Sequence, residues 1–200
     1  MLIKVVPSSI SAYSTQANGQ FEEIQTHLRK IITDCVGVVY DGEAAVAFKN
    51  ETGEMASAFA KVINGRLMGM VTAVNTSMSR ISGSLGGTPP VVGFTAQSTV
   101  APPGVSLTPD LYDVNTQGLT DLKGLLTTSF TGVRAGLTAH KGALEGTTWE
   151  GIAKQSALTE VAALTTKAHA DCDLYLNQLI VKIDAQVTSS KAADTLAVGH

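Results

Sequence analysis

Apolar residues spaced three and four positions apart constrain the fold of this 200-residue chain more than any other feature of its sequence. Such spacing places apolar side chains on one face of a helix. In the first half these positions form two series: Tyr13, Ala17, Phe21, Ile24, Leu28, Ile31 and Cys35, then Phe48, Met55, Phe59, Ile63, Leu67, Met70, Val74, Met78 and Ile81. In the second half they form two more: Leu119, Leu122, Leu126, Phe130, Val133, Leu137 and Leu144, then Ile152, Ala163, Cys172, Leu176, Leu179, Ile183 and Val187. Sustained spacing of this kind is typical of long antiparallel helices in a bundle, so the chain is predicted to be all-α.

An uncharged segment rich in proline and glycine, 83–109, divides this helical pattern into two halves. It holds five of the six prolines, and its Pro-Pro and Gly-Gly pairs stop helices. Each half is interrupted once more, at 37–42 and at 145–148, where the chain is expected to reverse direction. The sequence therefore predicts a first helical hairpin at 1–82, a linker at 83–109 and a second hairpin at 110–200.

The two halves are similar to each other, which indicates an internal duplication. A shift of 109 positions aligns Phe21 with Phe130, Leu28 with Leu137, Tyr40 with Trp149, Gly42 with Gly151, and Leu67 with Leu176. Two unrelated amphipathic hairpins would also match at apolar positions. The aromatic-x-Gly triplet at both breaks favours duplication over chance.

Tyr40, Gly42, Trp149 and Gly151 form the candidate functional motif, one aromatic-x-Gly at the tip of each hairpin. Glycine relieves the backbone where the chain reverses direction, and the large aromatic covers the helix ends and can hydrogen-bond through its polar edge. We expect Trp149 to be partly exposed. Two roles are open for the tips: packing of the turn alone, or packing together with recognition of a partner.

The chain resembles two tandem copies of the WXG family, the ESAT-like substrates of type VII secretion. The resemblance rests on Trp149-Glu150-Gly151 in the second half, on Tyr40-Asp41-Gly42 in the first, and on Val6-Pro7 before the first helix. It covers nearly the whole chain, although the first copy has tyrosine in place of tryptophan. The resemblance implies that the two hairpins pair antiparallel in a four-helix bundle, that the chain is exported, and that it binds a protein partner.

The length of the linker is a separate indication of how the hairpins are arranged. A helix over 43–82 would be about 60 Å long, and the linker reaches roughly 90 Å when fully extended. Antiparallel hairpins require the linker to run from one end of the bundle to the other, whereas parallel hairpins need only a short turn. The long linker favours the antiparallel arrangement.

Members of this family often carry Tyr-x-x-x-Asp/Glu after the second helix as part of the export signal. Here Tyr13, Tyr40, Tyr112 and Tyr175 are followed at the fourth position by Ala17, Ala44, Thr116 and Leu179. Either a partner supplies that signal, or the chain is not itself the recognised substrate.

Composition disfavours several classes of function. The formal net charge is −3 and no basic cluster is longer than Arg29-Lys30, whereas nucleic-acid-binding proteins carry a basic stripe or patch. The N-terminal segment lacks the apolar core of a cleavable signal peptide, and no run approaches the roughly 18 apolar residues of a membrane span. We therefore expect a secreted or cell-surface protein that uses a route without a cleavable signal peptide.

Few residues suggest a metal site or catalysis. His169, Asp171, Cys172 and Asp173 include metal-ligand types, but a buried thiol among solvated neighbours is the favoured interpretation, because closed sites need four convergent ligands. No nucleophile elbow, zinc-protease helix or phosphate-binding loop occurs in the sequence. The chain is predicted to have no catalytic residues, no metal and no cofactor.

The other histidines and the two cysteines are given structural roles. His27, His140 and His200 have no sequence neighbour that suggests a catalytic dyad, so solvated helix positions are expected for all three. Cys35 lies near the first tip and Cys172 midway along the last helix, so their heights differ by roughly 20 Å. Because a disulfide needs Cα atoms about 4.4–6.8 Å apart, we predict two buried thiols that do not pair with each other.

Together these patterns predict a non-enzymatic exported helical protein of a type VII-like secretion system. It would act by protein–protein binding, as an effector, a chaperone or a secretion partner. The alternative is a membrane-active or pore-forming secreted protein, because helices that are rich in methionine and low in charge can refold onto lipid.

Overall fold

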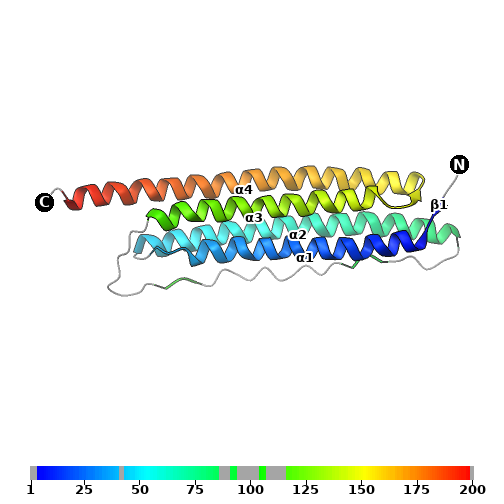
Figure 1. Ribbon diagram of the computed structural model, residues 1–200, viewed down its shortest axis with the longest axis horizontal. Helices are drawn as coiled ribbons and strands as arrows, with labels where there is room; N and C mark the ends of the chain where they lie inside the picture. The colour runs from blue at the N-terminus through cyan, green and yellow to red at the C-terminus, as the bar shows by residue number, and fades with distance from the viewer. Residues whose placement is uncertain (1–3, 41–42, 86–90, 94–103, 107–115, 199–200) are drawn as a thin grey trace. The chain divides into compact units, whose positions relative to one another are not determined.

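The computed structural model describes residues 4–40, 43–85, 91–93, 104–106 and 116–198 (Figure 1). The chain is all-α, as predicted, with helices α1 (Pro7–Gly37), α2 (Glu43–Leu85), α3 (Thr116–Glu145) and α4 (Ile152–Val198). Two short strands, β1 (Lys4–Val5) and β2 (Trp149–Glu150), pair antiparallel, with Lys4 opposite Glu150 and Val5 opposite Trp149. The sequence did not predict these strands, because two residues are too few to show an alternating pattern.

The helices are divided between two compact units. Unit 1 comprises the described residues of Met1–Thr26, Val62–Ser98 and Gly132–Asp171, and unit 2 those of His27–Lys61, Thr99–Thr131 and Cys172–His200. Unit 1 therefore combines the first part of α1 with the last part of α2, and the last part of α3 with the first part of α4. This is the four-helix bundle of antiparallel hairpins that was predicted. The tip between α3 and α4 falls in unit 1, and the tip between α1 and α2 falls in unit 2.

Most of the predicted linker, 83–109, lies outside the described residues. Its first three residues belong to α2, which ends at Leu85. Two further pieces are described, 91–93 and 104–106, and neither is helix or strand.

The apolar faces predicted for the first three helices form the core. Every predicted position of α1 and α3 is buried, and in α2 only Met55 and Ile81 are half-buried. Burial of these aliphatic and aromatic side chains supplies the main driving force for a bundle of this kind. In unit 2, for example, the ring of Phe59 stacks on Phe130 with centroids 4.5 Å apart.

The face predicted for α4 is partly wrong. Ile152 and Ala163 were assigned to the core, but both are exposed. The buried positions in that part of the helix are instead Ala157, Val161, Thr165 and Ala168. Alanine and threonine are common on both faces of α4, so the sequence gives little contrast between the buried and exposed sides.

Candidate functional site at the hairpin tips

The Trp149 tip is joined to the N-terminal segment of the chain. Trp149 lies on β2, opposite Val5 of β1, and its side chain is 0% exposed. The Val6 amide donates a hydrogen bond to the carbonyl of Thr148 at 3.2 Å, and the Thr148 amide donates to Ser9 Oγ at 2.7 Å. The expectation that Trp149 is partly exposed is wrong, because the sequence does not show that residues 4–9 return to this tip.

The turn between α3 and α4 depends on one glycine and one lysine. Gly151 has a φ of 122°, a conformation that side-chain-bearing residues rarely adopt, so the glycine of the motif has a specific backbone role. The Lys154 ammonium donates to the carbonyls of Glu145 at 2.9 Å and Thr147 at 2.7 Å. A positive charge at the carboxyl end of α3 is favoured by the helix dipole. Lys154 was not predicted as a residue of this tip, although a lysine in the first turn after a helix break is a usable signal.

Trp149 is held at this tip by packing. Its indole Nε1 has no hydrogen-bond partner within the described part of the chain. The expected hydrogen bond from the indole N–H is therefore not formed with any described residue. Burial of apolar area is the main contribution of Trp149 to stability.

The Tyr40 tip is held by side chains. Tyr40 is buried, its hydroxyl accepts a hydrogen bond from Nε2 of Gln186 on α4, and its ring meets Phe48 edge-on at a centroid distance of 6.1 Å. Gly42, the predicted glycine of this tip, lies outside the described residues, as does Asp41. The structure thus places one buried aromatic at each tip, in different units.

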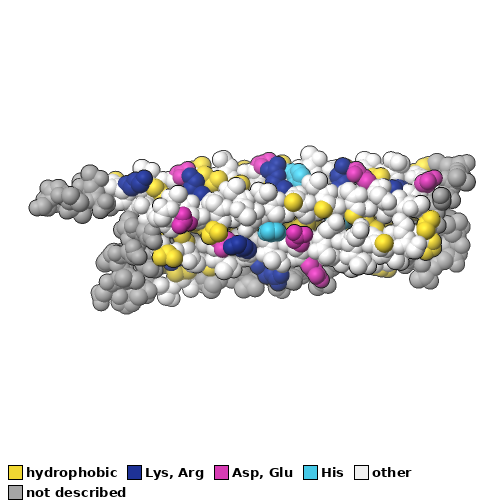
Figure 2. All heavy atoms as spheres, viewed as in Figure 1, with side chains coloured by type: hydrophobic (Ala, Val, Ile, Leu, Met, Phe, Trp, Pro, Cys, Tyr) yellow, Lys and Arg dark blue, Asp and Glu magenta, His cyan; other side chains and the backbone are white. Residues whose placement is uncertain are grey.

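An exposed apolar side chain lies next to the buried aromatic at each tip. Val39 precedes Tyr40 and is 60% exposed, and Ile152 follows Trp149 by three residues and is 66% exposed. Neither residue was predicted as a site, because Val39 was grouped with the turn and Ile152 with the core. On the face seen in Figure 2, charged side chains of both signs are scattered among uncharged ones.

His140 contradicts the expectation of a solvated position. It is fully buried in unit 1, where its Nε2 lies 2.9 Å from the Tyr13 hydroxyl and its ring centroid lies 4.7 Å from that of Phe21. Burial lowers the pKa of His140 to about 4 and raises the pKa of Tyr13 above its ordinary value. The sequence could not show this, because Tyr13 is 127 positions away. His27 is half-buried, and His200 lies outside the described residues.

The residues of metal-ligand type have other contacts. His169 Nε2 lies 3.3 Å from the Arg134 carbonyl, and Asp171 forms an ion pair with Arg66 at 3.0 Å. Among the described residues, no three His, Cys, Asp or Glu side chains are grouped to hold a metal ion. Cys35 and Cys172 are buried and not joined by a disulfide, as predicted. Burial, with a smaller effect from Asp34, raises the pKa of Cys35 to about 12, which disfavours the nucleophilic thiolate form.

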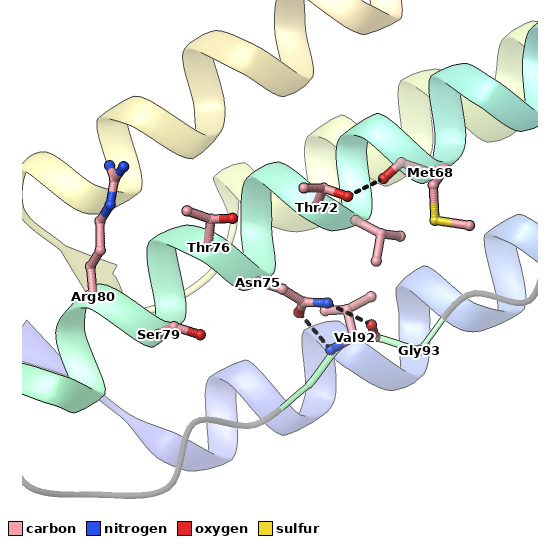
Figure 3. A pocket seen from close by; sticks show the side chains of 9 residues that line it. Met68, Thr72, Asn75, Thr76, Ser79, Arg80, Val92 and Gly93 are labelled. Carbon is pink, nitrogen blue, oxygen red and sulfur yellow. Dashed lines mark hydrogen bonds between the residues drawn. The ribbon is translucent and has the colours of Figure 1, made fainter.

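An open hollow of about 830 Å³ lies on α2 in unit 1 (Figure 3). Its walls are formed by one face of α2 and by the short piece 91–93: Met68, Val71, Thr72, Asn75, Thr76, Ser79, Arg80, Val92 and Gly93. Of the described residues that line it, Arg80 alone is charged.

None of the helices, over the residues described, has a stretch long and apolar enough to cross a membrane. The chain matches no protein-family model, no characterised protein and no solved structure.

Proposed function

We propose that this chain is a non-enzymatic exported protein of a type VII-like secretion system, and that it binds another protein through its hairpin tips. One observation carries the proposal: at each tip a buried aromatic of an aromatic-x-Gly motif lies beside an exposed aliphatic side chain. The buried ring fixes the shape of the tip, and the exposed side chain is available to a partner.

The energetics favour the exposed neighbours as the contact points. A partner that buries Val39 or Ile152 gains about 25 cal/mol for each Å² of apolar surface removed from water. Trp149 and Tyr40 are already buried, so a partner can remove little of their apolar surface from water. Binding energy at protein interfaces is concentrated in a few such side chains. The partner would be an effector, a chaperone or a component of the secretion apparatus.

Export is tested by expression in a bacterium with a functional type VII system and in the same strain with that system inactivated. We expect the chain in the medium of the first strain only, with a cytoplasmic marker retained in both. Because the chain lacks Tyr-x-x-x-Asp/Glu, co-expression with a partner that carries this signal is the second arm. Equal release from both strains, or no release in either arm, would refute the proposal.

A membrane-active protein is the second candidate, and one observation favours it. Leu174 and Val181 are exposed on α4 and are seven residues apart, so they lie on one side of the helix. Leakage of dye from anionic vesicles at micromolar protein would support this function. Intact vesicles together with export that depends on the secretion system would favour protein binding.

A further inference from the structure

The two short pieces 91–93 and 104–106 are each held to α2 by an asparagine side chain. In unit 1, Asn75 Nδ2 donates to the Val92 carbonyl at 2.9 Å, and the Val92 amide donates to Asn75 Oδ1 at 2.9 Å (Figure 3). In unit 2, the Val105 amide donates to Asn50 Oδ1 at 3.1 Å. Each asparagine therefore binds the backbone of one valine.

The bond pair at Asn75 is the kind that a neighbouring β-strand makes to an extended peptide. A side-chain amide offers one donor and one acceptor side by side, which an aspartate or a leucine of similar size does not. Ser14 adds a third bond, from its hydroxyl to the Val91 carbonyl at 3.3 Å. The segment is bound through its backbone, so the contact is specific for an extended chain with a free amide at that position.

Side-chain burial along 91–93 agrees with a bound peptide. Val92 is 2% exposed, whereas the preceding residue, Val91, is 68% exposed. One side chain is therefore inserted against the helices and its neighbour faces solvent. The hollow beside Val92 is lined by residues of the same part of α2.

The sequence repeats this arrangement. Asn50 and Asn75 are 25 residues apart, which is close to seven helical turns, so they belong to one face of α2. Val92 and Val105 each come two residues after a Pro-Pro pair and are 13 residues apart.

We propose that α2 recognises an extended valine-containing peptide at Asn75 in unit 1 and, by a second contact of the same kind, at Asn50 in unit 2, and that the occupants are the pieces 91–93 and 104–106 of the chain's own linker. Each piece is then a ligand bound in cis, and the same segment is recognised when it is supplied as a separate peptide. This inference does not depend on the function proposed for the tips.

Amide hydrogen exchange on the full chain tests the recognition directly. We expect the amides of Val92 and Val105 to be protected from exchange. Asn75→Leu should lower protection at Val92 by about tenfold or more while sparing Val105, and Asn50→Leu should do the reverse. Leucine is a good helix former, so both variants should keep the helical circular dichroism of the parent. Unprotected amides in the parent chain, or protection unchanged in both variants, would overturn the proposal.

Binding in trans is the second test. The probe is a synthetic peptide of residues 88–107, and the receptor is the chain with 86–110 replaced by a Gly/Ser segment of equal length. We expect saturable binding, and about tenfold weaker binding to the parent chain, where the linker competes at high effective concentration. A peptide with N-methylvaline at position 92 lacks the donor to Asn75 and should bind about tenfold more weakly. Equal binding of both peptides would exclude backbone recognition. The exchange measurement decides the question if the receptor variant does not fold.

Discussion

The two hairpin tips carry the same aromatic-x-Gly motif but are held in different ways. At the Trp149 tip a second segment of the chain, β1, pairs with the motif, and Lys154 binds the carbonyls at the end of α3. At the Tyr40 tip the ring is held by Phe48 and by a hydrogen bond from Gln186. The motif thus determines that a ring is buried at the turn, while the segments that reach each tip determine how it is stabilised.

The polar edges of the two rings show the same difference. The Tyr40 hydroxyl is hydrogen-bonded, whereas the Trp149 Nε1 has no partner within the described residues. Truncation of Trp149 should therefore lose mainly packing energy. Tyr40 also stabilises its tip mainly by packing, and a smaller part of its contribution comes from a hydrogen bond that can be removed by itself.

The largest effect is expected from Trp149→Ala. Full burial of this side chain predicts a loss of about 3–5 kcal/mol in the free energy of unfolding, because truncation leaves a cavity. Urea denaturation followed by far-ultraviolet circular dichroism measures the loss, since the variant has no tryptophan. Ile152→Ala, at the exposed neighbour, is the matched control and should change stability by less than about 0.5 kcal/mol. A loss of unfolding free energy below about 1 kcal/mol for Trp149→Ala would contradict the full burial of this side chain.

Acid should weaken unit 1 through His140. Its folded pKa, about 4, lies below the ordinary value of 6.5, so the unfolded state binds the proton first as the pH falls. The stabilisation is fully present above pH 6.5 and is lost as the pH falls towards 4, by about 3 kcal/mol at 1.36 kcal/mol per pKa unit. Urea denaturation followed by Trp149 fluorescence at several pH values measures it. The stability of His140→Phe should lack this loss between pH 6.5 and 4. The same pH dependence in the parent chain and the variant would show that His140 is not its source.

Gly151→Ala tests the backbone of the Trp149 tip. The positive φ of Gly151 predicts a loss of about 1–3 kcal/mol for any side chain. Gly124→Ala is the control, because Gly124 lies within α3 with open space around it. This substitution should stabilise the chain by about 0.5–1 kcal/mol. Thermal denaturation of both variants decides the point, and equal effects would show that the turn tolerates a side chain.

The smallest effect is expected from Tyr40→Phe. Loss of the hydrogen bond from Gln186 should reduce stability by about 0.5–1.5 kcal/mol. A double-mutant cycle with Gln186→Leu measures the coupling. Additive losses would show that the two side chains stabilise the Tyr40 tip independently.

The fold could be predicted from the sequence where apolar and polar residues contrast strongly. That contrast is clear in α1 and α3, and every predicted core position there is buried. It is weak in α4, where the exposed Ile152 was assigned to the core. The burial of residues that contact distant segments could not be predicted. His140 is hydrogen-bonded to Tyr13, and Trp149 lies on β2, which pairs with β1. At the tips, the aromatic and glycine positions follow from the motif, but the exposed side chains beside them do not.

The proposed function requires that a partner contacts the exposed neighbours of the buried aromatics, Val39 and Ile152. The most direct test combines Val39→Asp with Ile152→Asp and measures stability and export on the same protein. Both side chains are exposed, and aspartate at position 152 lies in the first turn of α4, where the helix dipole favours it, so folding should be retained. We predict an unfolding free energy within about 0.5 kcal/mol of the parent, together with loss of export that depends on the secretion system. Parent-like export by this folded variant would contradict the claim.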